Sequence, residues 1–183
     1  MSRIHTLESE NASQEVAALY DAVKQKLGLV PNMVKALGNS QAALEGYLGL
    51  SGAVSGDSLS PQTREKIALL SAQLNDCDYC LRAHTAIGSL MKIPSDELKA
   101  ARHAESTDLK EQAILTLTKA IIETKGQVPE STQIAVKSAG VTEAEAAEVV
   151  ANVAVNLYTN YFNRYAQTEC EFPEVEAAQC SCC

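Results

Sequence analysis

Residues 60–84 read SPQTREKIALLSAQLNDCDYCLRAH, and this stretch predicts two helices joined by a sharp bend. Ser60 is a suitable N-cap, and Pro61 fits the first helical position, where its missing N–H removes no hydrogen bond. We predict the bend at Asn75–Asp76 and Asp76 as the N-cap of the second helix. The two helices should then fold back on each other as an antiparallel hairpin.

The hairpin decides where Glu65 and His84 lie. Glu65 is about 15 Å before the bend and His84 about 12 Å after it, at the usual helical rise. In an antiparallel hairpin the two side chains reach nearly the same level, so we expect direct or one-water contact between them. The apolar neighbours of Glu65 on its own helix place its carboxylate at the border of a core face.

Two cysteines share the face of the second helix that carries His84. Cys77 to Cys80 turns about 300° and Cys80 to His84 about 400°, so the three side chains form one narrow stripe. Cysteines three residues apart in a first helical turn can form a disulfide with little rearrangement. The positive end of the helix dipole there favours thiolate over thiol. Histidine can shuttle protons near neutral pH, across one water at this spacing.

Cap and stop signals outline further helices on both sides of this hairpin. The predicted helices begin near Ser13, Pro31, Ser40, Ser95, Thr107 and Pro129, and the longest follows the capping box Thr142-x-x-Glu145. No stretch alternates with period two, so we predict no strand. The sequence predicts an all-α domain over residues 1–171, followed by a tail, residues 172–183, with a cysteine-rich end.

Composition and charge narrow the class of protein. The chain has 183 residues, of which 46% are hydrophobic and 21% charged, as in an ordinary folded domain. A net charge of -8 argues against nucleic-acid binding. No apolar run suggests a signal segment or a membrane span. We expect a cytoplasmic protein without nucleic-acid or membrane partners.

The six cysteines gather in two places, which argues against a disulfide scaffold. Cys77 and Cys80 stand mid-chain, while Cys170, Cys180, Cys182 and Cys183 crowd the end. A scaffold would spread its bridges through the fold. Redox or metal chemistry is the better interpretation of the mid-chain pair. Three interpretations of the terminal CSCC remain open: a chain end with incidental thiols, a binding site for a soft metal ion, and a thiol relay to the Cys77–Cys80 pair.

A metal site and a purely structural thiol pair compete with a redox pair at Cys77 and Cys80. Cys77, Cys80 and His84 supply three soft ligands, one short of a closed zinc site, and three ligands on one helix make poor tetrahedral geometry. We therefore expect a redox dithiol, with no metal and no bound organic cofactor.

The pattern Glu65-x11-Cys77-x2-Cys80-x3-His84 resembles the signature of the alkyl hydroperoxidase D-like (AhpD-like) branch of the carboxymuconolactone decarboxylase family. The resemblance extends upstream through GLVPNMVKALGNS and covers most of residues 15–168. It implies an all-helical bundle with the CxxC at the N-terminus of a central helix. It also implies a homotrimer or homohexamer.

The resemblance further implies a thiol peroxidase that reduces organic hydroperoxides at the expense of an unidentified thiol or dithiol. Cys80 would be the peroxidatic thiol and Cys77 the resolving one, joined in a redox-active disulfide. Glu65 and His84 would form the proton relay. One departure is Tyr79, which stands where the founding hydroperoxidase has a histidine. The Tyr79 hydroxyl is a possible auxiliary group that orients a water or the substrate.

Two other functions remain open at this level. A carboxymuconolactone decarboxylase-like enzyme would share the fold, although that chemistry does not require a CxxC. A non-enzymatic redox or metal-binding module would share the thiols.

Overall fold

The fold is all-α, as predicted. The computed structural model describes residues 2–56 and 58–175, and within them the chain forms nine α-helices, one short 3-10 helix and no strand. None of the helices in these two ranges is both long and apolar enough to cross a membrane. The α-helices are α1 Gln14–Leu27, α2 Asn32–Leu37, α3 Gln41–Ala53, α4 Pro61–Leu74, α5 Asp78–Leu90, α6 Ser95–Ala101, α7 Leu109–Thr124, α8 Glu130–Ser138 and α9 Glu143–Ala166.

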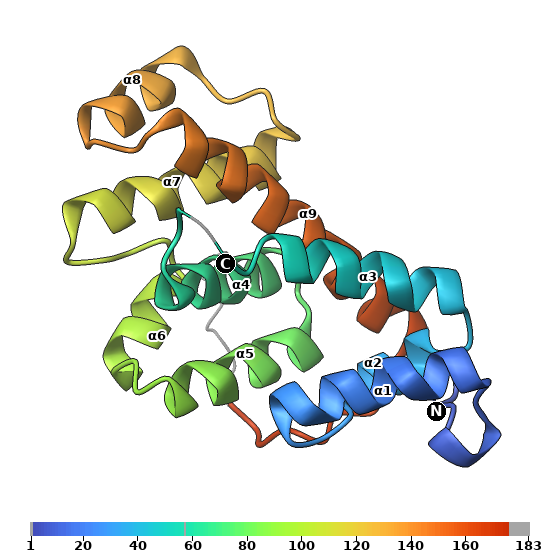
Figure 1. The fold of residues 1–183 in the computed structure, drawn as a ribbon. Coiled ribbons are helices and arrows are strands. Elements are labelled where there is room, and N and C mark those ends of the chain that lie inside the picture. Colours follow the sequence, from blue (N-terminus) through green and yellow to red (C-terminus); the bar gives the residue numbers. More distant parts are fainter. Residues whose placement is uncertain (1, 57, 176–183) are drawn as a thin grey trace.

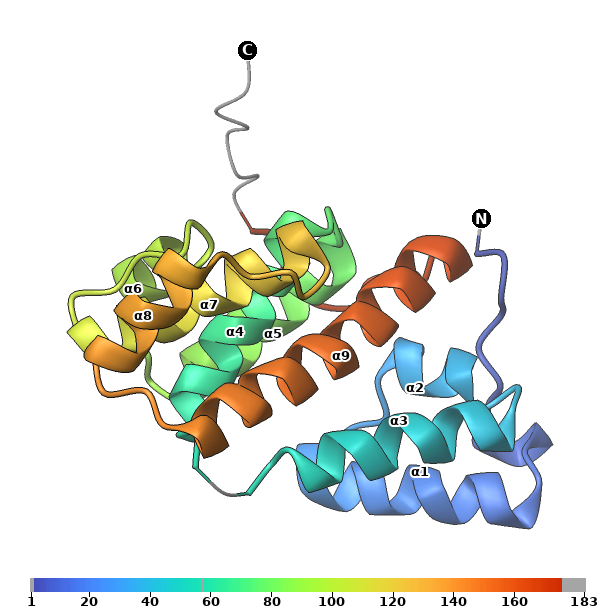
Figure 2. The same cartoon turned by 90° about the horizontal axis from the view of Figure 1, so that it is seen from above.

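The longest helix, α9, runs between two groups of helices (Figures 1 and 2). Figure 2 shows α1, α2 and α3 on one side of α9, and α4 to α8 on the other. Helix α4 packs against α5, α7 and α9, and α3 also packs against α9. Helices α3, α4 and α5 therefore all lie against α9.

Helix α4 belongs to both hydrophobic cores. Leu69 and Ala72 pack into the core built with α1, α2, α3 and α5. Ile67 and Leu70, on the other face, pack into the core built with α6, α7, α8 and α9. An apolar residue on each face is what a fully enclosed helix requires. The hairpin α4–α5 is thus fixed from two sides.

Four of the predicted helix starts are confirmed by their caps. The hydroxyls of Ser13, Ser40 and Ser60 each accept a hydrogen bond from a backbone N–H of the first turn. Thr142 and Glu145 form both halves of the predicted capping box. These contacts satisfy N–H groups that have no partner within their own helix.

The bend between α4 and α5 lies where it was predicted, but the cap assigned to it was wrong. Asp76 adopts a left-handed conformation with φ 50°, and the N-cap of α5 is Cys77. Reversing the chain within three residues requires a left-handed position, which Asp tolerates better than most residues. Cys77 is extended, and its Sγ accepts a hydrogen bond from the Cys80 N–H at 3.4 Å.

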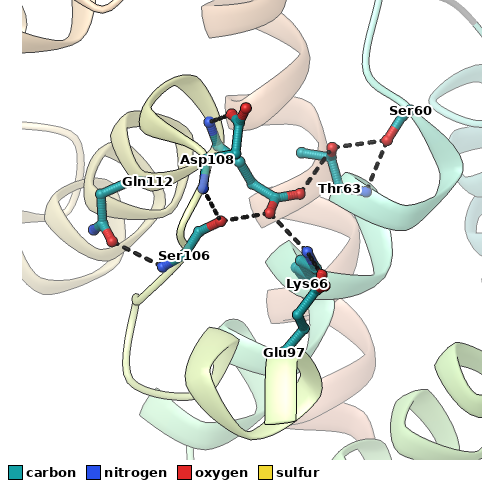
Figure 3. A network of polar contacts seen from close by, with 8 residues as sticks. Ser60, Thr63, Lys66, Glu97, Ser106, Asp108 and Gln112 are labelled. Carbon is teal, nitrogen blue, oxygen red and sulfur yellow. Dashed lines mark hydrogen bonds and ion pairs between the residues drawn. The ribbon is translucent and has the colours of Figure 1, made fainter. Parts of the chain in front are cut away.

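An ion-pair network holds α4 against α6 and α7 (Figure 3). Lys66 Nζ donates to Glu97 Oε2 and to Glu111 Oε2, both at 2.7 Å. Glu111 also accepts hydrogen bonds from Ser106 at 2.7 Å and from Thr63 at 3.4 Å. Burial opposes the charge of Lys66, but the two carboxylates outweigh it and raise the pKa of the amine. The network fixes the helix that carries Glu65.

We expect Gly38→Ala to lower the free energy of unfolding by about 1–3 kcal/mol, the usual effect of overpacking. A Cβ at Gly38 would collide with the ring and hydroxyl of Tyr20. That buried hydroxyl donates to the backbone oxygens of Leu7 and Lys35, each at 3.1 Å, so it cannot move freely. Urea unfolding measures the change.

Gly46→Ala is the matched control for this prediction. Gly46 lies inside α3, and an added Cβ there meets no atom within 4 Å. Alanine should raise the free energy of unfolding by up to about 1 kcal/mol. Equal midpoints for the two variants would contradict the account of Tyr20.

Candidate active site

The hairpin brings Glu65 and His84 into direct contact, as predicted. Glu65 Oε2 lies 2.8 Å from His84 Nδ1, and both side chains are partly exposed, at 15% and 22%. Burial lowers the pKa of His84, but the charge and hydrogen bond of Glu65 and the charge of Cys80 outweigh it, so the net shift is upward. A protonated imidazole is therefore favoured beside Cys80.

Cys77 and Cys80 form a hydrogen-bonded pair of free thiols at the start of α5. Cys77 Sγ donates to Cys80 Sγ at 2.7 Å, longer than the 2.03–2.05 Å of a disulfide bond. Both residues are buried. The sulfurs can therefore become bonded with little movement of the backbone.

The surroundings of the two thiols differ and set which one ionises. The hydrogen bond from Cys77 lowers the pKa of Cys80, burial opposes this, and the charge of His84 and the amides of Asn163 and Asn160 lower it further. The pKa of Cys77 is raised, because its proton is held by Cys80 and because it is buried. Ionisation is therefore favoured at Cys80, and Cys77 keeps its proton.

Two groups at this site have no counterpart in the sequence motif. Asn163 of α9 donates from Nδ2 to Cys80 Sγ at 3.3 Å. Tyr47 of α3 lies within electrostatic reach of Cys80 and Glu65; burial raises the pKa of its hydroxyl, and those two negative charges add to the rise. The spacing of asparagines along α9 was an available signal for Asn163, whereas Tyr47 carries no local signal.

Tyr79 faces the chain after α9. Its hydroxyl accepts from the Met33 N–H at 3.2 Å and donates to Glu171 Oε1 at 3.0 Å. Its ring packs edge-on against Phe172, with centroids 5.7 Å apart. These contacts give Tyr79 a structural role; that it also orients water or substrate stays a prediction.

The start of the predicted tail packs on the domain. Arg82 donates from Nε to the backbone oxygens of Phe172 at 3.0 Å and Pro173 at 3.1 Å. Phe172 and Val175 pack against the first core. Helix α5 therefore anchors residues 172–175 as well as the dithiol. Cys180, Cys182 and Cys183 lie outside the described residues. The three alternatives for the terminal CSCC therefore stay open.

The alternative interpretation of Cys77, Cys80 and His84 was a metal site, and the described part of the chain shows no set of ligands for one. Within residues 2–56 and 58–175, no group of three or more His, Cys, Asp or Glu side chains is arranged to hold a metal ion. The carboxylate of Glu65 is hydrogen-bonded to His84, and the Cys77 thiol is hydrogen-bonded to Cys80.

Comparison with known proteins agrees with this fold. Residues 41–120 match the model of the carboxymuconolactone decarboxylase family, a segment that contains Glu65, Cys77, Cys80 and His84. No curated protein matches the sequence. The matched segment is thus similar to the carboxymuconolactone decarboxylase family, and the fold of the chain is AhpD-like.

Three solved structures share the fold over nearly the whole chain. One is the alkylhydroperoxidase AhpD core of an uncharacterized peroxidase-related protein from Ralstonia eutropha JMP134, with TM-score 0.82 and 21% identity over 92% of this chain and 91% of that one. A peroxidase-related protein from Silicibacter sp. TM1040 has TM-score 0.78 and 19% identity, covering 91% and 92%. The debrominase Bmp8, in complex with 2,3,4-tribromopyrrole, has TM-score 0.80 and 18% identity, covering 93% and 92%.

Proposed function

We propose that the protein is a thiol peroxidase that reduces organic hydroperoxides through a Cys77–Cys80 disulfide. The observation that carries the proposal is the geometry at Cys80, which accepts a hydrogen bond from Cys77 and whose pKa is lowered beside the Glu65–His84 pair. A thiolate is the form of cysteine that attacks peroxides. The family match and the peroxidase-related neighbours support the same class of chemistry.

The first step oxidises Cys80. Its thiolate attacks the terminal oxygen of the hydroperoxide, an S–O bond forms and the O–O bond breaks. The electron pair leaves on the alkyl-side oxygen, which takes a proton from His84 and departs as the alcohol. Because Glu65 holds His84 Nδ1, the proton is transferred at Nε2, and Glu65 stabilises the imidazolium before transfer.

The second step closes the disulfide. Cys77 attacks the sulfur of the Cys80 sulfenic acid, an S–S bond forms and water leaves with the Cys77 proton. The sulfur atoms are already neighbours, so this step needs little motion. An external dithiol then reduces the disulfide and is itself oxidised. The physiological donor is a thiol or dithiol whose identity the site does not specify.

One equivalent of cumene hydroperoxide should convert Cys77 and Cys80 to one intramolecular disulfide, which peptide mapping by mass spectrometry detects. Cys170 is the internal control. Burial raises the pKa of its thiol, so it should stay reduced. A map with Cys77 and Cys80 both free, or with oxidation only at other cysteines, contradicts the proposal.

The same experiment should also test a second reductive activity, debromination, because the fold is shared with a debrominase. A dithiol supplies two electrons, the number needed to replace an aromatic bromine by hydrogen and release bromide. Bromide release from a bromopyrrole without peroxide reduction would favour this activity. A decarboxylase or a non-enzymatic module would give neither reaction.

We further propose a cytoplasmic homotrimer or homohexamer, as the family resemblance implies. Helix α9 carries exposed apolar and aromatic side chains on its outer face, namely Val150, Tyr161 and Tyr165. Such side chains are typical of subunit contacts.

A further inference from the structure

Helix α9 buries four asparagines, and two of them differ from the others in their bonding. Asn152 and Asn156 donate from Nδ2 to backbone oxygens of their own helix, both at 2.8 Å. Asn160 and Asn163, one turn further on, make no such bond among the described residues and lie beside Cys80. All four are buried, with exposures of 6% or less.

The amide of Asn160 is held in one orientation. Asn75 Nδ2 donates to Ser71 O at 2.7 Å and to Asn160 Oδ1 at 3.1 Å. Since a donor must face Oδ1, the Asn160 amide is turned so that Nδ2 points away from Asn75. This nitrogen makes no well-formed hydrogen bond among the described residues, but it lies close enough to Cys80 for its hydrogen bonding to lower the pKa of that thiol. A fully buried N–H donor is thus directed at the thiolate site.

The amide of Asn163 is oriented by the sulfur. Cys80 already accepts from Cys77, and as a thiolate it accepts only, so the Asn163 N–H faces it at 3.3 Å. Asn163 Oδ1 is buried and has no hydrogen-bond partner among the described residues. One unpaired donor and one unpaired acceptor therefore lie beside the same sulfur. Leaving such groups unpaired is unfavourable unless a ligand meets them.

We propose that Asn160 and Asn163 bind the O–O–H group of the hydroperoxide and hold it against Cys80. The hydroperoxide has one donor, its O–H, and this bonds to Asn163 Oδ1. Its alkyl-side oxygen accepts from Asn160 Nδ2, which is where negative charge develops as the O–O bond breaks. The terminal oxygen then lies at the sulfur, ready for attack. This inference rests on the proposed function and adds the substrate-binding groups to it.

The test compares Asn160→Ala, Asn163→Ala and the control Asn156→Ala. Asn156 is equally buried on the same helix, but it bonds only within that helix. The first measurement is the pH profile of Cys80 alkylation by iodoacetamide, which reports the thiolate without any peroxide. In Asn163→Ala, the midpoint of this profile should move upward by about one pH unit, because a hydrogen bond to a charged group is lost. In Asn156→Ala, the midpoint should stay at the wild-type pH.

The second measurement is single-turnover oxidation of Cys80 by tert-butyl hydroperoxide, at a pH where the thiolate is fully formed in every variant. Asn160→Ala and Asn163→Ala should be slower than wild type by about tenfold or more, and the control should stay within about twofold. If the slow-down disappears once the thiolate is saturated, the amides only stabilise the thiolate, and the binding role is overturned.

An isosteric variant separates binding from folding. Asn160→Leu keeps the volume of the side chain and adds no charge at this fully buried position but removes the N–H, so the fold should be retained while oxidation slows. Wild-type rates in both Asn160 variants overturn the inference and leave the peroxidase proposal intact. If Cys80 of the wild-type protein does not react with hydroperoxide at all, both the inference and the peroxidase proposal are overturned. The disulfide map detects that outcome independently.

Discussion

Replacing Cys80 with serine is expected to lower hydroperoxide reduction by at least about 10³-fold, which corresponds to about 4 kcal/mol of barrier. The loss is large because a serine hydroxyl does not ionise near neutral pH and its oxygen is a poor nucleophile towards peroxide. Consumption of hydroperoxide with a small dithiol as donor measures the effect.

Cys77→Ser is the matched control for that variant. It keeps the nucleophile, so Cys80 should still be oxidised once to a sulfenic acid, which a dimedone probe traps. Steady turnover should fall, because no disulfide can form between the two positions. Equal single-turnover oxidation in both variants would show that Cys80 is not the attacking thiol.

Glu65→Gln is expected to slow Cys80 oxidation by about 10²-fold, the lower end of the usual contribution of general acid–base catalysis. Glutamine can still contact His84 Nδ1, so the geometry is retained, but the negative charge that raises the pKa of His84 is lost. His84 then loses its proton at a lower pH. The defect should therefore be larger at neutral and alkaline pH than at acid pH.

The measurement is the rate of Cys80 oxidation as a function of pH in wild type and variant. Glu123→Gln is a suitable control, since Glu123 is half-exposed on α7 and pairs with Lys119 at 3.9 Å. A Glu65→Gln profile parallel to that of wild type would show that the Glu65–His84 pair does not supply the proton.

Local hydrogen bonds made much of the fold predictable. The caps at Ser13, Ser40 and Ser60 depend on residues at most three positions away, and the sequence shows those residues directly. The Glu65–His84 contact was predictable for a related reason, since helical rise and one bend fix it. Asp76 was misassigned because the left-handed turn follows from the packing of two helices, and the sequence alone favours Asp as a cap.

The remaining site groups depend on contacts between distant segments. Asn163 reaches Cys80 across 83 positions of sequence, through the packing of α9 against α5. Tyr47 arrives from α3, which precedes the hairpin. The spacing of asparagines along α9 points to Asn163 but does not identify Cys80 as its neighbour, and no pattern in α3 points to Tyr47. A single sequence therefore yields the two neighbouring thiols and the Glu65–His84 contact but not the groups around them.

The sharing of α4 between two cores has a consequence for how the protein unfolds. The helix that carries Glu65 is enclosed by Leu69 on one side and Ile67 on the other, so it cannot separate from the protein while either core survives. Its backbone amides should exchange with solvent deuterium only through global unfolding. Heat inactivation and the cooperative melting transition are then one event, and residual activity becomes a direct measure of the folded fraction.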